Sequence, residues 1–70
     1  MQPGDLVVLI SVPAAMFSGL PEEDQMAIRS VIGKTVTFTG ITYGQAELEF
    51  KDDRGDDHTI WVDTDRIKPS

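Results

Sequence analysis

Residues 34–62 read KTVTFTGITYGQAELEFKDDRGDDHTIWV, and this stretch decides the fold. It contains three short segments in which apolar and polar residues alternate, at 34–41, 45–50 and 58–62. Such alternation is typical of a β-strand with one buried face. Turn residues separate the segments, so we predict an antiparallel meander of three strands.

The alternation also assigns side chains to the two faces of this meander, because neighbouring residues of a strand point to opposite sides. Tyr43 and Gly44 are expected to make a tight connection between the first two strands. A longer hairpin follows at 52–56, with Gly55 as the expected residue of positive φ. The inward side chains are predicted to be Val36, Phe38, Ala46, Leu48, Phe50, Ile60 and Val62.

The residues before the meander predict one strand, one loop and one helix. Residues 6–12 form a β-branched run with little alternation, which predicts a strand covered on both faces and ended by Pro13. Met16 and Phe17 are expected to pack under the following loop as an outlying part of the core; a docking patch is the alternative. Acidic residues follow Pro21, an apolar stripe comes next (Ala27, Ile28, Val31, Ile32), and Gly33 can end a helix, so we predict a helix over about 21–32.

The last residues predict a single 3₁₀ turn and a short final strand that places Ile67 on the core. The whole chain, residues 1–70, is interpreted as a single domain, since 70 residues supply material for one core. There is no cysteine for disulfides, and one histidine, His58, is too few for a zinc site. No residue set has the arrangement of a catalytic site, so we expect no enzyme activity, no catalytic residue, no metal and no cofactor.

The charge is −6, with six basic and twelve acidic residues, which argues against phosphate-backbone binding. Six of the acidic residues lie between Glu47 and Asp57, where only two residues are basic. This acidic segment favours a basic protein as the partner; the alternative is a solvated hairpin tip that only keeps the protein soluble. The apolar run 6–10 is too short for a signal peptide, and no run approaches the roughly 18 apolar residues of a membrane helix. We therefore expect a cytoplasmic protein that binds neither nucleic acid nor membrane.

Four motifs together resemble a known group of proteins. They are an opening Gly4–Val7 (GDLV), then Gly33–Val36 (GKTV), Ala46–Phe50 (AELEF) with its following turn, and IWV at 60–62 leading to DRIKP at 65–69. This order, over residues 4–69, resembles the small SH3-like barrels of bacteria, several families of which are uncharacterised. The resemblance implies a mainly β fold, a five-stranded SH3-like barrel with one inserted helix. Barrels of this type serve as peptide-binding, RNA-associated or accessory domains, so the fold alone does not choose a function.

Trp61 is the strongest candidate binding residue. If Ile60 and Val62 face the core, Trp61 lies on the outer face of the sheet, beside Glu47 or Glu49 of the neighbouring strand. An exposed tryptophan among carboxylates suits a partner that carries Arg or Lys. The alternative is that the predicted helix covers Trp61 and forms a second small core with it.

The leading interpretation is a small non-catalytic module that binds a basic protein through its acidic hairpin and the region of Trp61. The expected binding residues are Trp61, Glu47, Glu49, Asp52, Asp53, Asp56 and Tyr43. An acidic inhibitor or immunity-type protein, or an accessory subunit, that caps a basic enzyme is the first alternative, and a nucleic-acid-associated barrel is the second. We expect a monomer or a weak homodimer, because the sheet of such a barrel has free edges.

Overall fold

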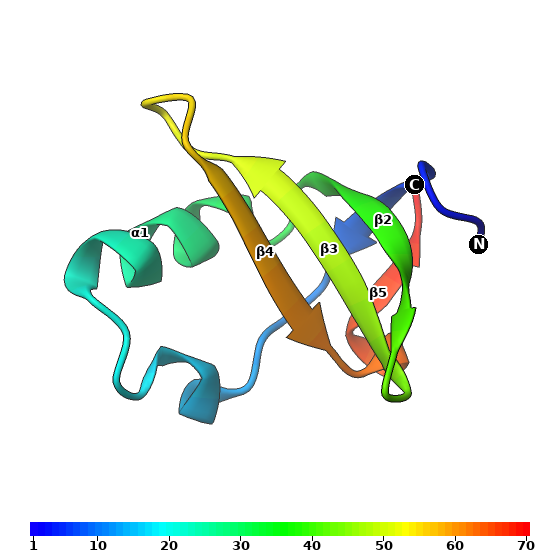
Figure 1. Cartoon of the computed structure of the whole chain (residues 1–70), viewed down its shortest axis with the longest axis horizontal. Coiled ribbons are helices and arrows are strands. Elements are labelled where there is room, and N and C mark those ends of the chain that lie inside the picture. Colours follow the sequence, from blue (N-terminus) through cyan, green and yellow to red (C-terminus); the bar gives the residue numbers. More distant parts are fainter.

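The computed structural model describes all 70 residues and is mainly β (Figure 1). The five strands are β1 (Leu6–Leu9), β2 (Thr35–Thr42), β3 (Gln45–Lys51), β4 (Asp57–Val62) and β5 (Ile67–Pro69). Between β1 and β2 lie a 3₁₀ helix, η1 (Ala14–Phe17), and one α-helix, α1 (Glu22–Val31); a second 3₁₀ helix, η2 (Thr64–Arg66), precedes β5. The predicted meander, helix, 3₁₀ turn and last strand are therefore confirmed.

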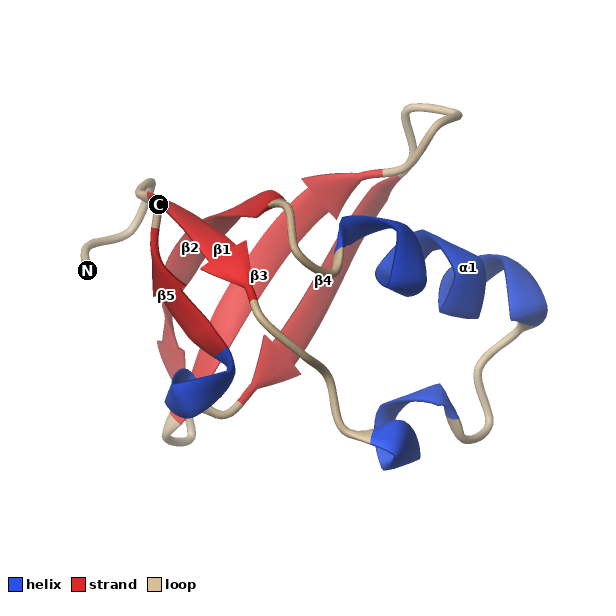
Figure 2. Cartoon of the chain, turned by 180° about the vertical axis from the view of Figure 1, so that it is seen from behind, coloured by secondary structure: helices blue, strands red, loops and turns tan.

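The strands form one antiparallel sheet in the order β4-β3-β2-β1-β5. Every neighbouring pair is antiparallel, and the first strand pairs with the last through Val7 and Pro69. The sheet does not close, because β4 and β5 each have a neighbour on one side only. It curls instead, so that β1 and β5 lie across from β3 and β4 (Figures 1 and 2).

The hydrophobic core lies inside this curl. All seven inward side chains predicted for the meander are buried, and Ile67 of β5 is buried with them. Helix α1 lies beside the sheet at the end that carries the β3–β4 hairpin, and it adds Ala27, Ile28 and Val31 to the same core (Figure 2). Met16 and Phe17 pack against the core from η1, which confirms their predicted role.

Two details of the predicted N-terminal half are wrong. The first strand is shorter than residues 6–12, and it is covered on one face only, with Leu6 and the following Ile10 both exposed. The reason is that β1 belongs to a single curled sheet, whose outer face meets solvent. The helix also ends one residue early: Ile32 has extended backbone angles and is exposed, so it does not continue the buried stripe.

The turns follow the glycines as expected. Tyr43 and Gly44 connect β2 to β3 with φ values of 51° and 78°, the pattern of a two-residue hairpin turn. Gly55 has a φ of 81° in the β3–β4 hairpin. A β-bulge interrupts β2 between Phe38 and Gly40, so Thr39 is an extra residue in the pairing with β3.

None of the helices has the length and apolar character needed to cross a membrane.

Candidate functional site

Trp61 lies on the outer face of β4, with 43% of its surface exposed. Its inward neighbours Ile60 and Val62 are buried, as predicted. The apolar stripe of α1 packs into the main core instead, so the alternative in which the helix covers Trp61 is wrong. The indole is therefore available on the outer face of the sheet.

The carboxylate of Glu47 is held beside this indole. Glu47 is the cross-strand partner of Trp61, and the indole Nε1 donates a hydrogen bond to Glu47 Oε1 at 3.2 Å. From the other side, Thr39 Oγ1 donates to Glu47 Oε2 at 2.6 Å. The β-bulge makes Thr39 the extra residue of β2 at this point. The carboxylate is thus fixed by donors from two neighbouring strands, which orients it next to the tryptophan ring.

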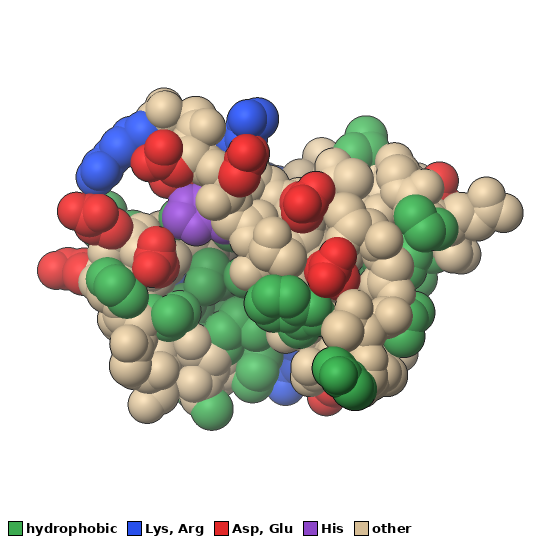
Figure 3. Space-filling model, viewed as in Figure 1, with side chains coloured by type: hydrophobic (Ala, Val, Ile, Leu, Met, Phe, Trp, Pro, Cys, Tyr) green, Lys and Arg blue, Asp and Glu red, His purple; other side chains and the backbone are tan.

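Further acidic side chains continue this face toward the hairpin. Glu49 is opposite Thr59 on β4 and Thr37 on β2, and it is exposed. Neither Glu47 nor Glu49 forms an ion pair within the chain. Figure 3 shows acidic side chains both on the sheet and around the hairpin. The face therefore carries negative charge that no residue of the chain neutralises.

Some charged residues of the β3–β4 hairpin form ion pairs within the chain, and others do not. Lys51 pairs with Asp57 at 3.0 Å, and Arg54 approaches Glu23 of α1 at 3.8 Å. Asp53 and Asp56 are exposed. These two carboxylates of the hairpin have no ion-pair partner within the chain.

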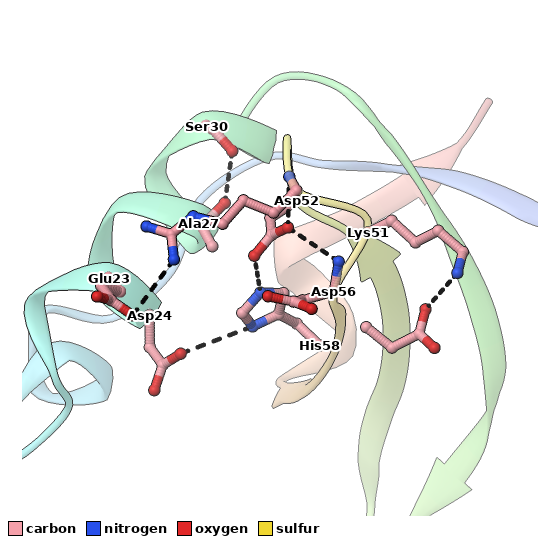
Figure 4. Close-up of polar contacts among 10 residues, drawn as sticks. Glu23, Asp24, Ala27, Ser30, Lys51, Asp52, Asp56 and His58 are labelled. Atoms are coloured by element: carbon pink, nitrogen blue, oxygen red, sulfur yellow. Dashed lines mark hydrogen bonds and ion pairs between the residues drawn. The ribbon is translucent and has the colours of Figure 1, made fainter.

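Asp52 has a structural role in the hairpin. Its Oδ1 accepts hydrogen bonds from the backbone N–H groups of Arg54 and Asp56, at 2.9 and 3.0 Å. Its Oδ2 lies 2.8 Å from Nε2 of His58 (Figure 4). With 18% of its side chain exposed, Asp52 mainly shapes the turn and contributes little open surface.

His58 joins the hairpin to α1. Its ring stacks on Phe50 at a centroid distance of 5.2 Å, and 15% of the side chain is exposed. Its Nδ1 lies 3.9 Å from a carboxylate oxygen of Asp24, in the first turn of α1 (Figure 4). The imidazole therefore lies between two carboxylates that come from different elements. Asp24 had no place in the predicted site, because nothing in the sequence shows which strand the first turn of the helix approaches.

The His58 cluster borders a cavity of about 420 Å³, but its geometry does not form a nucleophile and base pair. The one hydroxyl group in the cavity wall, that of Ser30, donates a hydrogen bond to the Ala27 carbonyl oxygen at 2.6 Å. No group of three or more potential metal-ligating side chains is arranged around an ion position. The cluster links α1 to the hairpin through polar contacts.

The contact between Asp52 and His58 makes the free energy of unfolding depend on pH. The hydrogen bond with His58, followed by the backbone N–H donors of Asp56 and Arg54, holds the pKa of Asp52 below its ordinary value, although desolvation acts in the opposite direction. Because the pKa is lower in the folded chain than in the unfolded chain, the contribution of Asp52 is complete above about pH 4 and is lost as the pH falls through the lowered pKa.

We expect Asp52→Asn to lower stability at neutral pH and to lose this difference from the wild type in strong acid. The measurement is urea unfolding of both proteins between neutral pH and about pH 2. Asp53→Asn is the matched control, since Asp53 is the exposed neighbour, and it should change little. A stability difference for Asp52→Asn that is the same at every pH would contradict this account.

The predicted binding residues do not form one cluster. Glu47, Glu49 and Trp61 lie together on the outer face of the sheet, and Asp53 and Asp56 lie on the adjoining hairpin. Asp52 is turned toward His58. Tyr43 is fully exposed in the β2–β3 turn, at the end of the sheet opposite the hairpin (Figure 1). The Glu47–Trp61 pair lies nearer to this turn than to the hairpin, because Glu47 is close to the start of β3.

Comparison of the chain with protein-family models, curated proteins and solved structures gave no match. The candidate site therefore rests on its own geometry. We call Trp61, Glu47 and Glu49, with Asp53 and Asp56 of the hairpin, the Trp61 surface.

Proposed function

We propose that this protein is a small non-catalytic module that binds a basic protein through the Trp61 surface. The observation that carries the proposal is the exposed indole of Trp61, fixed beside a carboxylate that has no ion pair. A partner's Arg or Lys placed over the ring would gain a cation–π contact and an ion pair with Glu47. The charge of −6 would speed the encounter with a basic partner.

We also propose that the fold is an SH3-like barrel with α1 inserted between β1 and β2. The strand order, the pairing of the first strand with the last, and the 3₁₀ turn before β5 support this assignment. The curl of the sheet around one core supports it as well. In this assignment the Trp61 surface belongs to the outer face of the meander.

Replacing Trp61 by alanine tests the proposed surface. We expect affinity for the partner to fall about 30-fold or more, which corresponds to a hot-spot loss of about 2 kcal/mol. Stability should fall by only about 1 kcal/mol or less, because the ring lies on the outer face. The matched control is Tyr43→Ala, which removes an exposed aromatic side chain from the β2–β3 turn.

The partner is sought by affinity capture from native lysate at low and high salt, with wild-type and Trp61→Ala proteins side by side. A basic protein that the wild type retains, that salt releases and that the variant loses supports the proposal. Recovery of one basic enzyme at one-to-one stoichiometry would favour an inhibitor or accessory subunit over a general module. Equal loss of folding and binding in the variant would overturn the assignment of Trp61 to the surface.

A further inference from the structure

The two edges of the sheet differ in their protection against another strand. The β5 edge has only three residues and contains Lys68 and Pro69, two features that discourage strand pairing. The β4 edge has six residues, DHTIWV, with neither lysine nor proline and without a bulge in its pairing to β3. The β4 edge is therefore the more favourable of the two for pairing with an additional strand.

The hydrogen-bond pattern identifies the backbone groups that β4 offers. The Asp52 N–H donates to the Asp56 carbonyl oxygen, which fixes the phase of the antiparallel ladder. Hydrogen-bonded and non-hydrogen-bonded pairs alternate from there, so Asp57, Thr59 and Trp61 belong to non-hydrogen-bonded pairs. Their N–H and C=O groups point away from β3, toward the open edge.

A groove of about 450 Å³ runs along this edge. Its far wall is apolar and is formed by Met16 of η1, by Leu20 and by Ile28 of α1. Figure 3 shows hydrophobic side chains in the floor of the hollow between the helical side and the sheet. A chain lying there would find unpaired backbone groups on one side and apolar side chains on the other.

The charge of the groove indicates what kind of chain it accepts. Asp24 and Asp57 line the groove, and Trp61 forms part of its wall. A second copy of the protein also carries a charge of −6, so pairing two β4 edges would bring like charges together. An extended segment with basic residues meets opposite charge instead, and apolar residues at alternate positions would face Met16 and Ile28.

Resting on the proposed binding function, we infer that the partner contributes an extended peptide that adds to β4 as a sixth strand of the sheet. The peptide alternates apolar side chains, which enter the groove, with Arg or Lys side chains, which reach Trp61 and the neighbouring carboxylates. Backbone hydrogen bonds to Thr59 and Trp61 give affinity, and the side chains give selectivity. This mode of recognition is strand addition at a free sheet edge.

The test begins with a displayed library of random linear peptides selected on the intact protein. Enriched sequences should alternate basic and apolar residues. One such peptide is then synthesised in three forms: unmodified, N-methylated at the alternate residues that face β4, and N-methylated at the others. We expect the first methylated form to lose binding by about 100-fold or more and the second to bind like the unmodified peptide. Asp24→Asn should weaken binding of the unmodified peptide about fivefold and reduce its salt dependence.

Amide hydrogen exchange, read by NMR, locates the added strand. The exchange rates of the Thr59 and Trp61 amides should fall by about tenfold or more in the complex. The exchange rate of the Ile60 amide, which faces β3, should change little. Peptides whose binding needs Trp61 but leaves these amides unprotected would overturn strand addition and leave the proposed function standing. Failure to select any basic peptide would overturn both. Protection of the same amides on concentrating the protein alone would identify a second copy as the occupant and would overturn the inference.

Discussion

Replacing Leu48 by alanine is expected to remove most of the stability of this protein. Leu48 is fully buried, with 0% exposure, on β3 in the interior of the sheet, between β2 and β4. Truncating a buried leucine costs about 2–5 kcal/mol, because transfer energy is lost and a cavity is left. A single core in a domain of this size supplies on the order of 3–5 kcal/mol, so the variant should be largely unfolded at room temperature.

The measurement is urea unfolding followed by circular dichroism and by the fluorescence of Trp61, the one tryptophan. Leu6→Ala is the matched control: it makes the same chemical change at a strand residue that is 57% exposed. It should cost about 0.5 kcal/mol or less. If the two variants were equally stable, the burial of the inner face of β3 would be contradicted.

The second large effect is expected from Ile28→Ala, which removes the central side chain of the α1 stripe. Ile28 is buried in the core together with Ala27 and Val31, and the loss should be about 2–4 kcal/mol. Alanine has the higher helix propensity, so a measured loss reports packing against the sheet and not helix formation. The free energy of unfolding in urea gives the size of the effect.

Met26→Ala is the control for this variant, because Met26 lies on the exposed side of the same helix. Hydrogen exchange adds a second readout. Faster exchange of the α1 amides alone would show that the helix detaches from an intact sheet, whereas faster exchange throughout would show that helix and sheet unfold together. Equal effects of Ile28→Ala and Met26→Ala would contradict the packing of α1 against the core.

The meander could be predicted because apolar and polar residues alternate within each strand, a pattern that only a few neighbouring residues define. In β3 and β4 inward-facing residues alternate with outward-facing ones, so the pattern within residues 45–50 and 58–62 is enough to assign the two faces. The helix was predictable for a similar reason, since Pro21 and Gly33 mark its two ends. The prediction for the first strand was wrong because a continuous apolar run does not show whether one face or both faces of the strand are covered. Leu6 and Ile10 are in fact exposed.

The candidate site was only partly predictable. The position of Trp61 beside Glu47 follows from the strand register, which the hairpin turn sets. The approach of Asp24 to His58 depends on where α1 docks, and no short-range pattern contains that information. The groove is also a product of docking, since η1 and α1 have to lie opposite β4 before their apolar side chains form its wall. The inward turn of Asp52 reflects competition between solvent and the backbone donors of its own hairpin.

The pairing of β1 with β5 has a practical consequence for work on this protein. It brings both chain ends to the same side of the molecule, remote from α1 and from the groove (Figures 1 and 2). A purification tag, a fluorophore or a sensor-chip linkage at either end would thus leave β4 open. The two ends are also near enough in space to be joined by a short linker, so the chain could be circularised and reopened at the exposed turn of Tyr43 and Gly44.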